Sequence, residues 1–98
     1  MLITEIVTFD LPEGMSRDDV VALYEKTKPR WQANAALIRK YYLYDEEAGI
    51  GGGVYLWPSR ADALAAHDEE WCVLAEKTYG CRPRFQVFDT PVIVDNST

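Results

Sequence analysis

The stretch from Gly51 to Arg60, Gly-Gly-Gly-Val-Tyr-Leu-Trp-Pro-Ser-Arg, constrains the fold more than any other part of the chain. The alternating side chains of residues 54–57 predict a strand with two different faces. Pro58 has no N–H for a strand ladder and Ser59 is a favoured helix N-cap residue, so the strand ends there and a helix begins. Three consecutive glycines at the start of the strand indicate close approach by a ligand, a bulge or another backbone.

Hydrophobic periodicity predicts three more strands and a second helix. A helix begins at Ser16, and Pro29 predicts that it either stops near Lys28 or kinks there and resumes. The helix that begins at Ser59 runs to about Tyr79, and a break near Asp68 is compatible with its pattern. The predicted strands are residues 1–10, 36–44, 51–57 and 83–89. The apolar stripe of the first helix is Val20, Leu23, Tyr24, Thr27 and Trp31, and that of the second is Leu64, His67, Trp71, Leu74, Ala75 and Thr78.

The element order β-α-β-β-α-β predicts an α+β fold of the ferredoxin-like type, built as one domain from residues 1–98. If Tyr44 pairs with Gly51, Lys40 lies across from Tyr55 in the hairpin. Two helices cover one sheet face, and we expect the other face to carry Tyr42, Tyr55, Trp57 and Phe88. Such a patch is larger than a soluble monomer usually exposes, which predicts a homodimer packed sheet against sheet, with residues 92–94 reaching the partner.

The acidic balance of the chain limits its partners. Its net charge of −6 and its scattered basic residues argue against nucleic acid, which needs a basic surface. No window approaches the ~20 apolar residues of a membrane span, and residues 1–9 lack the pattern of a signal peptide, so we expect no membrane partner and a cytoplasmic protein. The two cysteines, Cys72 and Cys81, are expected to be reduced and structural.

Four stretches carry a family resemblance. Residues 37–42 (Leu-Ile-Arg-Lys-Tyr-Tyr), 48–57 (Ala-Gly-Ile-Gly-Gly-Gly-Val-Tyr-Leu-Trp), 61–65 and 85–89 resemble the YdhR-type monooxygenases. That group belongs to the dimeric α/β-barrel superfamily, alongside cofactor-free antibiotic-biosynthesis monooxygenases. Lys40, Gly52, Gly53 and Tyr55 match the pattern of the group. The resemblance implies a ferredoxin-like fold, a homodimer with a pocket between sheet and helices, and an oxygenase whose substrate it does not name.

Candidate site residues combine proton-transfer groups with large aromatic side chains. His67 is the only histidine, and its place on an apolar stripe fits either a catalytic base or a hydrogen-bonded core residue. Lys40 and Arg84 are strand charges that either bind an anion or pair with acids such as Glu5 or Asp89. The predicted catalytic residues are His67, Lys40 and Arg84, and the predicted substrate-binding residues are Tyr42, Tyr55, Trp57, Trp71, Gly53 and Gln86.

No motif in the chain predicts a cofactor or a metal. Residues 51–53 lack the GxGxxG spacing and the following helix of a dinucleotide site, and neither HExxH nor Cys-x-x-Cys occurs. The leading hypothesis is therefore a cofactor-independent monooxygenase for a small aromatic or polyketide-like substrate. Two alternatives are a non-catalytic dimeric barrel that binds a small apolar ligand, and haem binding or degradation with His67 as axial ligand.

Overall fold

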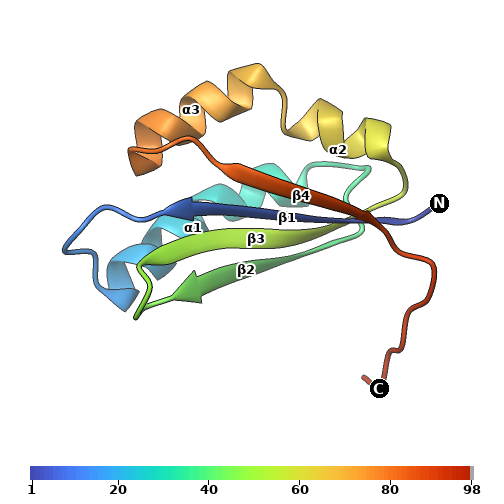
Figure 1. Cartoon of the computed structure of the whole chain (residues 1–98), viewed down its shortest axis with the longest axis horizontal. Helices are drawn as coiled ribbons and strands as arrows, with labels where there is room; N and C mark the ends of the chain where they lie inside the picture. Colours follow the sequence, from blue (N-terminus) through green and yellow to red (C-terminus); the bar gives the residue numbers. More distant parts are fainter. Residues whose placement is uncertain (98) are drawn as a thin grey trace.

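The computed structural model describes residues 1–97 and has the predicted ferredoxin-like α+β architecture. Four antiparallel strands form one sheet in the order β2-β3-β1-β4, covered on one face by three helices (Figure 1). The elements are β1 (Ile3–Asp10), α1 (Arg17–Gln32), β2 (Arg39–Asp45), β3 (Ile50–Trp57), α2 (Arg60–Ala66), α3 (Glu69–Tyr79) and β4 (Arg84–Asp89). Whether two copies form the dimeric barrel stays a prediction.

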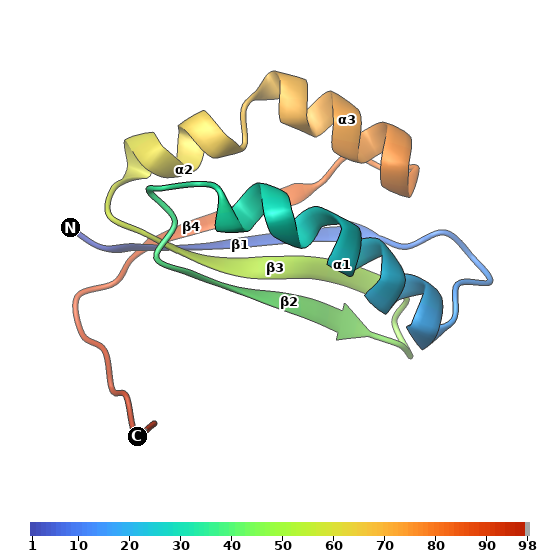
Figure 2. The ribbon, with the colours of Figure 1, turned by 180° about the vertical axis from the view of Figure 1, so that it is seen from behind.

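Helix α1 lies against the sheet beside the α2–α3 layer (Figure 2) and begins where the sequence predicts. Ser16 accepts a hydrogen bond from the Asp19 N–H and donates its own N–H to the Asp19 carboxylate, which completes a capping box. The helix continues through Pro29 to Gln32, so a stop near Lys28 is wrong and the alternative, a short resumption, holds. Burial of Trp31 in the last turn offsets the hydrogen bond that Pro29 cannot donate.

The predicted break in the second helix is confirmed and divides it into α2 and α3. His67 leaves helical geometry with φ −111° and ψ 55°, and Asp68 caps α3 by accepting from the Trp71 N–H at 2.9 Å. Because the helix is interrupted at His67, residues of α2 and α3 are not related by one continuous helical repeat. The prediction of a single apolar stripe through both helices is therefore wrong. Leu64, predicted to be part of that stripe, is 72% exposed, whereas Ala63 is buried.

The sequence left the hairpin register open, and the structure has the one considered above, in which Tyr44 pairs with Gly51 and Lys40 with Tyr55. The expected face is wrong for three aromatic residues, Tyr42, Tyr55 and Trp57. Tyr55 and Trp57 are 2% and 0% exposed in the core beneath the helices, and the Tyr55 ring lies 5.0 Å from that of Trp31 in α1. The reason is that the pairing of β1 with β3 joins Trp57 to Ile3, so the largest side chains of both strands share the helix-covered face.

The uncovered sheet face carries a smaller set of apolar side chains. Phe88 lies there as predicted and is 49% exposed, and Tyr41 of β2 is 57% exposed on the same face. Beyond β4 the chain leaves the sheet (Figure 1), after a hydrogen bond between the Thr4 and Thr90 hydroxyls at 2.6 Å. In residues 1–97 no helix has the length and apolarity needed to cross a bilayer.

Candidate active site

Lys40 is the most unusual charged group on the helix-covered face. Alternation along β2 directs it toward α1 together with Tyr42, and its register partner is Tyr55. The Lys40 Nζ atom lies 3.8 Å from the ring centroid of Tyr42, 4.4 Å from that of Trp31 and 4.6 Å from that of Tyr55. No carboxylate of residues 1–97 forms an ion pair with it. Three aromatic rings therefore surround one amine.

Burial and the nearby Arg30 guanidinium lower the pKa of Lys40 from 10.5 to about 7. Removal from water disfavours the ammonium, and a second cation disfavours it further. The ring faces attract the charged form and keep it populated in the apolar setting. At neutral pH this side chain is therefore able both to accept a proton and to stand as a cation beside a bound anion.

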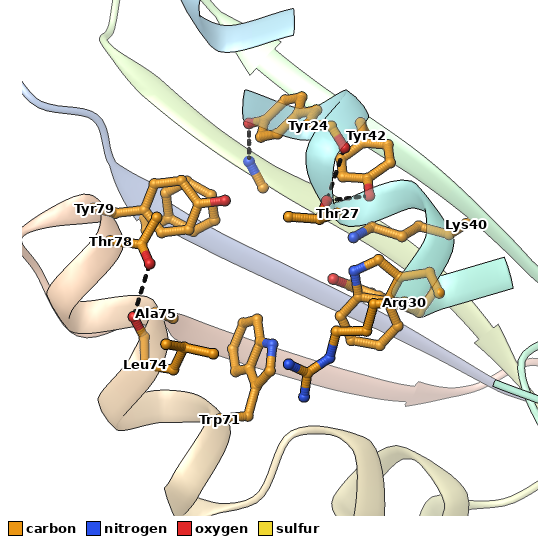
Figure 3. Close-up of a pocket in the computed structure, with 14 residues that line it drawn as sticks. Tyr24, Thr27, Arg30, Lys40, Tyr42, Trp71, Leu74, Ala75, Thr78 and Tyr79 are labelled. Atoms are coloured by element: carbon orange, nitrogen blue, oxygen red, sulfur yellow. Dashed lines mark hydrogen bonds between the residues drawn. The ribbon is translucent and has the colours of Figure 1, made fainter. Parts of the chain in front are cut away.

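A cavity of about 80 Å³ opens beside Lys40, between the sheet and the helices α1 and α3 (Figure 3). Its charged lining residues are Lys40 and Arg30, and no aspartate or glutamate is among the described residues that line it. The chain as a whole has a net charge of −6. The cavity is thus a local cationic site in an acidic protein. The remaining lining residues are Phe9, Tyr24, Thr27, Trp31, Tyr42, Gly52, Tyr55, Trp71, Leu74, Ala75, Thr78 and Tyr79.

Tyrosine hydroxyls supply the neutral polar groups of the cavity. Tyr42 and Thr27 hydrogen-bond through their hydroxyls, and the Tyr24 hydroxyl accepts from the Gly52 N–H (Figure 3). The Tyr24 hydroxyl also donates to the Leu43 carbonyl. Burial raises the pKa of Tyr24 and Tyr42, and it raises that of Tyr79 to about 12. These phenols therefore stay protonated at neutral pH, as hydrogen-bond donors rather than bases.

The three glycines of β3 make room for groups of this chain. A Cβ on Gly52 would lie 2.0 Å from the Val7 carbonyl oxygen, and one on Gly51 would lie 2.3 Å from the Tyr24 hydroxyl. A Cβ on Gly53 would lie 2.9 Å from Cε of Lys40. Of the three alternatives, close approach by another backbone therefore holds for Gly52, and that backbone is β1. Gly53 in addition leaves the space through which the lysine reaches the cavity.

His67 lies in the core and outside the cavity lining. Its Nδ1 atom is 2.7 Å from Oε1 of Glu5, which also accepts a hydrogen bond from the Trp57 indole at 2.9 Å. The imidazole is 1% exposed, and neither ring nitrogen has an aligned hydrogen-bond partner among the described residues. Aromatic rings enclose it, the nearest being those of Trp71 at 4.5 Å and Tyr55 at 4.6 Å. The position favours a structural role, and it leaves no open side for haem.

Arg84 and Gln86 lie far from this cavity, on the uncovered sheet face. Their register partners are Thr8 and Ile6 of β1, whose neighbours Val7 and Glu5 face the helices. The Arg84 guanidinium pairs with Asp10 at 3.2 Å, and half of its side chain is exposed. The structure therefore separates these two predicted site residues from Lys40, because alternation on β4 directs them away from the helices.

Of the other predicted residues, Tyr42, Tyr55 and Trp71 line the cavity. Gly53 and Trp57 are not among the residues that line it, and Trp57 is buried in the core. Five further residues line the cavity although the sequence did not predict them as site residues: Tyr24, Thr27, Arg30, Trp31 and Tyr79. The signal for three of these was present, since Tyr24, Thr27 and Trp31 form the apolar stripe of α1. In residues 1–97 no cluster of three or more His, Cys, Asp or Glu residues has the arrangement of a metal site.

The fold is shared with solved ferredoxin-like structures that include antibiotic biosynthesis monooxygenases. No family model and no curated protein matches the sequence. A Nitrosomonas europaea protein of unknown function superposes with a TM-score of 0.75 at 10% identity, covering 99% of this chain and 96% of that chain. An inferred antibiotic biosynthesis monooxygenase of Bordetella bronchiseptica gives 0.70 at 16% identity, covering 93% and 98%. A variant of SnoaB, a cofactor-independent oxygenase from Streptomyces nogalater, gives 0.66 at 9%, covering 95% and 96%. Identities this low establish the fold alone.

Proposed function

We propose that this chain is a cofactor-independent monooxygenase acting on a small aromatic or polyketide-like compound. The observation that carries the proposal is the Lys40 amine, held between three aromatic rings at a cavity whose charged lining residues are two cations. The shared fold with a cofactor-independent oxygenase supports it. The matches at Lys40, Gly52, Gly53 and Tyr55 support the narrower proposal of a YdhR-type enzyme.

Lys40 serves as the base and then as the counter-ion. Its neutral amine removes a proton from an acidic C–H or O–H group of the substrate, and the resulting ammonium stabilises the anion beside it. Of the three phenols named above, Tyr24 donates to the Leu43 carbonyl and Tyr42 to Thr27, so the Tyr79 hydroxyl is the one that donates a hydrogen bond to the same anion. An electron-rich anion of this kind passes electrons to dioxygen itself. For an anthrone the balance is one CH₂ oxidised to C=O, with O₂ supplying the new carbonyl oxygen and the oxygen of one water.

The test is oxygen uptake by the metal-free protein with a panel of anthrones and hydroquinones. We expect enzyme-dependent consumption that depends on Lys40. Binding of the same compounds without oxygen consumption would contradict the enzyme proposal and support a ligand-binding barrel. That second function is favoured by the lining of the cavity, half of whose residues are aromatic, because aromatic side chains bind planar apolar molecules whether or not a reaction follows.

We further propose that two copies pair through the uncovered sheet face. Tyr41 and Phe88 are half exposed on it, and Val54 and Leu56 lie between them on the central strands. Val92, Ile93 and Val94 beyond β4 are 77%, 54% and 82% exposed, which leaves this arm available to a partner. Covering these apolar groups is the favourable term for association.

A further inference from the structure

Arg30 and Lys40 have unsatisfied positive charge at the same cavity. Among residues 1–97, five basic side chains pair with a carboxylate and five do not, and of the unpaired five Arg30 and Lys40 line this cavity, whereas Lys26, Arg39 and Lys77 do not. The Arg30 guanidinium instead lies 5.7 Å from the ring centroid of Trp31. In a protein with a net charge of −6, two unpaired cations at one cavity favour an anionic ligand.

The size of the cavity shows that a ligand must extend out of it. Its volume of about 80 Å³ is smaller than the roughly 150 Å³ of a cavity known to hold benzene. An adjoining groove of about 590 Å³ runs between the end of α1 and the α2–α3 layer. Arg30, Trp31, Trp71 and Leu74 line both spaces, so Arg30 lies at the boundary between them.

We propose that the ligand is an aromatic acid, with a ring at the cavity beside Lys40 and a carboxylate held by Arg30 at the junction with the groove. This inference rests on the proposed function and names the substrate class for the same site. A guanidinium binds a carboxylate through two parallel N–H donors, which fixes orientation as well as charge. The outer groove is lined by two acids, Asp68 and Glu70, as well as by Lys77. Because these charges are mixed, the groove itself does not select an anion, and the selectivity for a carboxylate comes from Arg30.

Calorimetric titration with 6-hydroxy-2-naphthoate and its methyl ester tests this proposal at low ionic strength. The two probes share the hydroxynaphthalene ring system, and the ester replaces the charged carboxylate by a neutral group that is one methyl larger. We expect wild type to bind the acid at least about tenfold more tightly than the ester, a difference of about 1.4 kcal/mol. Arg30→Gln should weaken binding of the acid by about tenfold more than it weakens binding of the ester, because Lys40 remains as the one cation among the described residues of the cavity. Lys26→Gln is the matched control, because Lys26 is exposed one turn earlier on α1, lines none of the described cavities and carries the same charge.

Equal affinity of wild type for acid and ester, or no binding of either, would overturn the proposal. So would an equal loss of acid affinity in the Arg30 and Lys26 variants, since net charge alone would then explain it. The outcome is separate from that of the enzyme proposal, because binding requires no turnover. Selective acid binding without oxygen uptake would support the aromatic acid as ligand and contradict the monooxygenase. Oxygen uptake together with equal affinity for both probes would support the monooxygenase and contradict the aromatic acid.

Discussion

The amine of Lys40 lies 3.8 Å from the ring centroid of Tyr42, two residues further along the same strand. Residues at this spacing share a sheet face, so the contact is set within β2. Trp31 from α1 and Tyr55 from β3 complete the enclosure at 4.4 and 4.6 Å. The contact between Lys40 and Tyr42 is local to the edge strand β2, and α1 and β3 add the rings that enclose the amine.

Replacing Lys40 by Met should reduce oxygen uptake with an anthrone by about 10²-fold or more, the usual contribution of a positioned base. Methionine keeps the length and the aromatic contacts but cannot accept a proton. Lys40→Arg should not rescue the rate, because a guanidinium stays protonated. An oxygen electrode measures both, with thermal unfolding as the check on folding. Activity of Lys40→Met within twofold of wild type would exclude Lys40 as the base.

The rate should rise with pH through about 7, because the active form of Lys40 is the neutral amine and its pKa is lowered to about 7. Arg30→Gln removes a repulsive cation, so the pKa of Lys40 should increase and the rising limb should move to higher pH. Profiles of kcat/KM measured on both proteins give the comparison. A limb that does not move in Arg30→Gln would show that Arg30 does not act on this amine.

Stability should also rise with pH between about 7 and 10.5. The pKa of Lys40 is lower in the folded chain than in the unfolded chain, so the unfolded chain binds more protons in this interval. The free energy of unfolding then increases with pH, by at most ~1.4 kcal/mol per pH unit. Urea unfolding at about pH 7 and pH 9 should show this gain in wild type but not in Lys40→Met. An equal gain in both proteins would assign it to other groups.

Gly52→Ala should destabilise the fold more than Gly53→Ala. The new methyl at residue 52 lies 2.0 Å from the Val7 carbonyl oxygen, and the β1 backbone cannot move away without breaking its strand pairing. At residue 53 the methyl meets the flexible end of the Lys40 side chain, which can move. We expect a cost of roughly 3 kcal/mol for the first and about 1 kcal/mol for the second. Denaturant unfolding measures both values, and equal costs would show that β1 and β3 separate easily.

His67→Ala should lower stability by about 2–4 kcal/mol, because it empties a volume enclosed by aromatic rings. Oxygen uptake per folded molecule should stay within a few fold of wild type, since His67 does not line the cavity. Added haem should give no Soret shift that depends on this residue. Loss of turnover at an unchanged folded fraction would restore His67 as a catalytic residue.

Light scattering at micromolar concentration should give the mass of a dimer for wild type and of a monomer for Phe88→Glu. A carboxylate on the uncovered sheet face opposes its burial in an interface. Leu64→Glu is the matched control, because Leu64 is also exposed but lies in the helical layer. A monomeric wild type would contradict the dimer. Loss of the dimer in the control would place the interface elsewhere.

The sequence was sufficient for features decided by neighbouring residues. The cap at Ser16 and the break near Asp68 depend on backbone groups within one turn. These local signals together specified the element order, and with it the ferredoxin-like class.

Only the tertiary structure decided which sheet face the helices cover, and therefore which residues meet. A period of two shows that Tyr55 and Trp57 share a face, but both faces of these strands are apolar enough to be buried. For the same reason Arg84 and Lys40 looked equivalent in sequence, although one pairs with Asp10 on the open face and the other lies among aromatic rings. The position of Arg30 beside Lys40 arises from packing α1 on β2, a contact between side chains that local sequence rules do not encode.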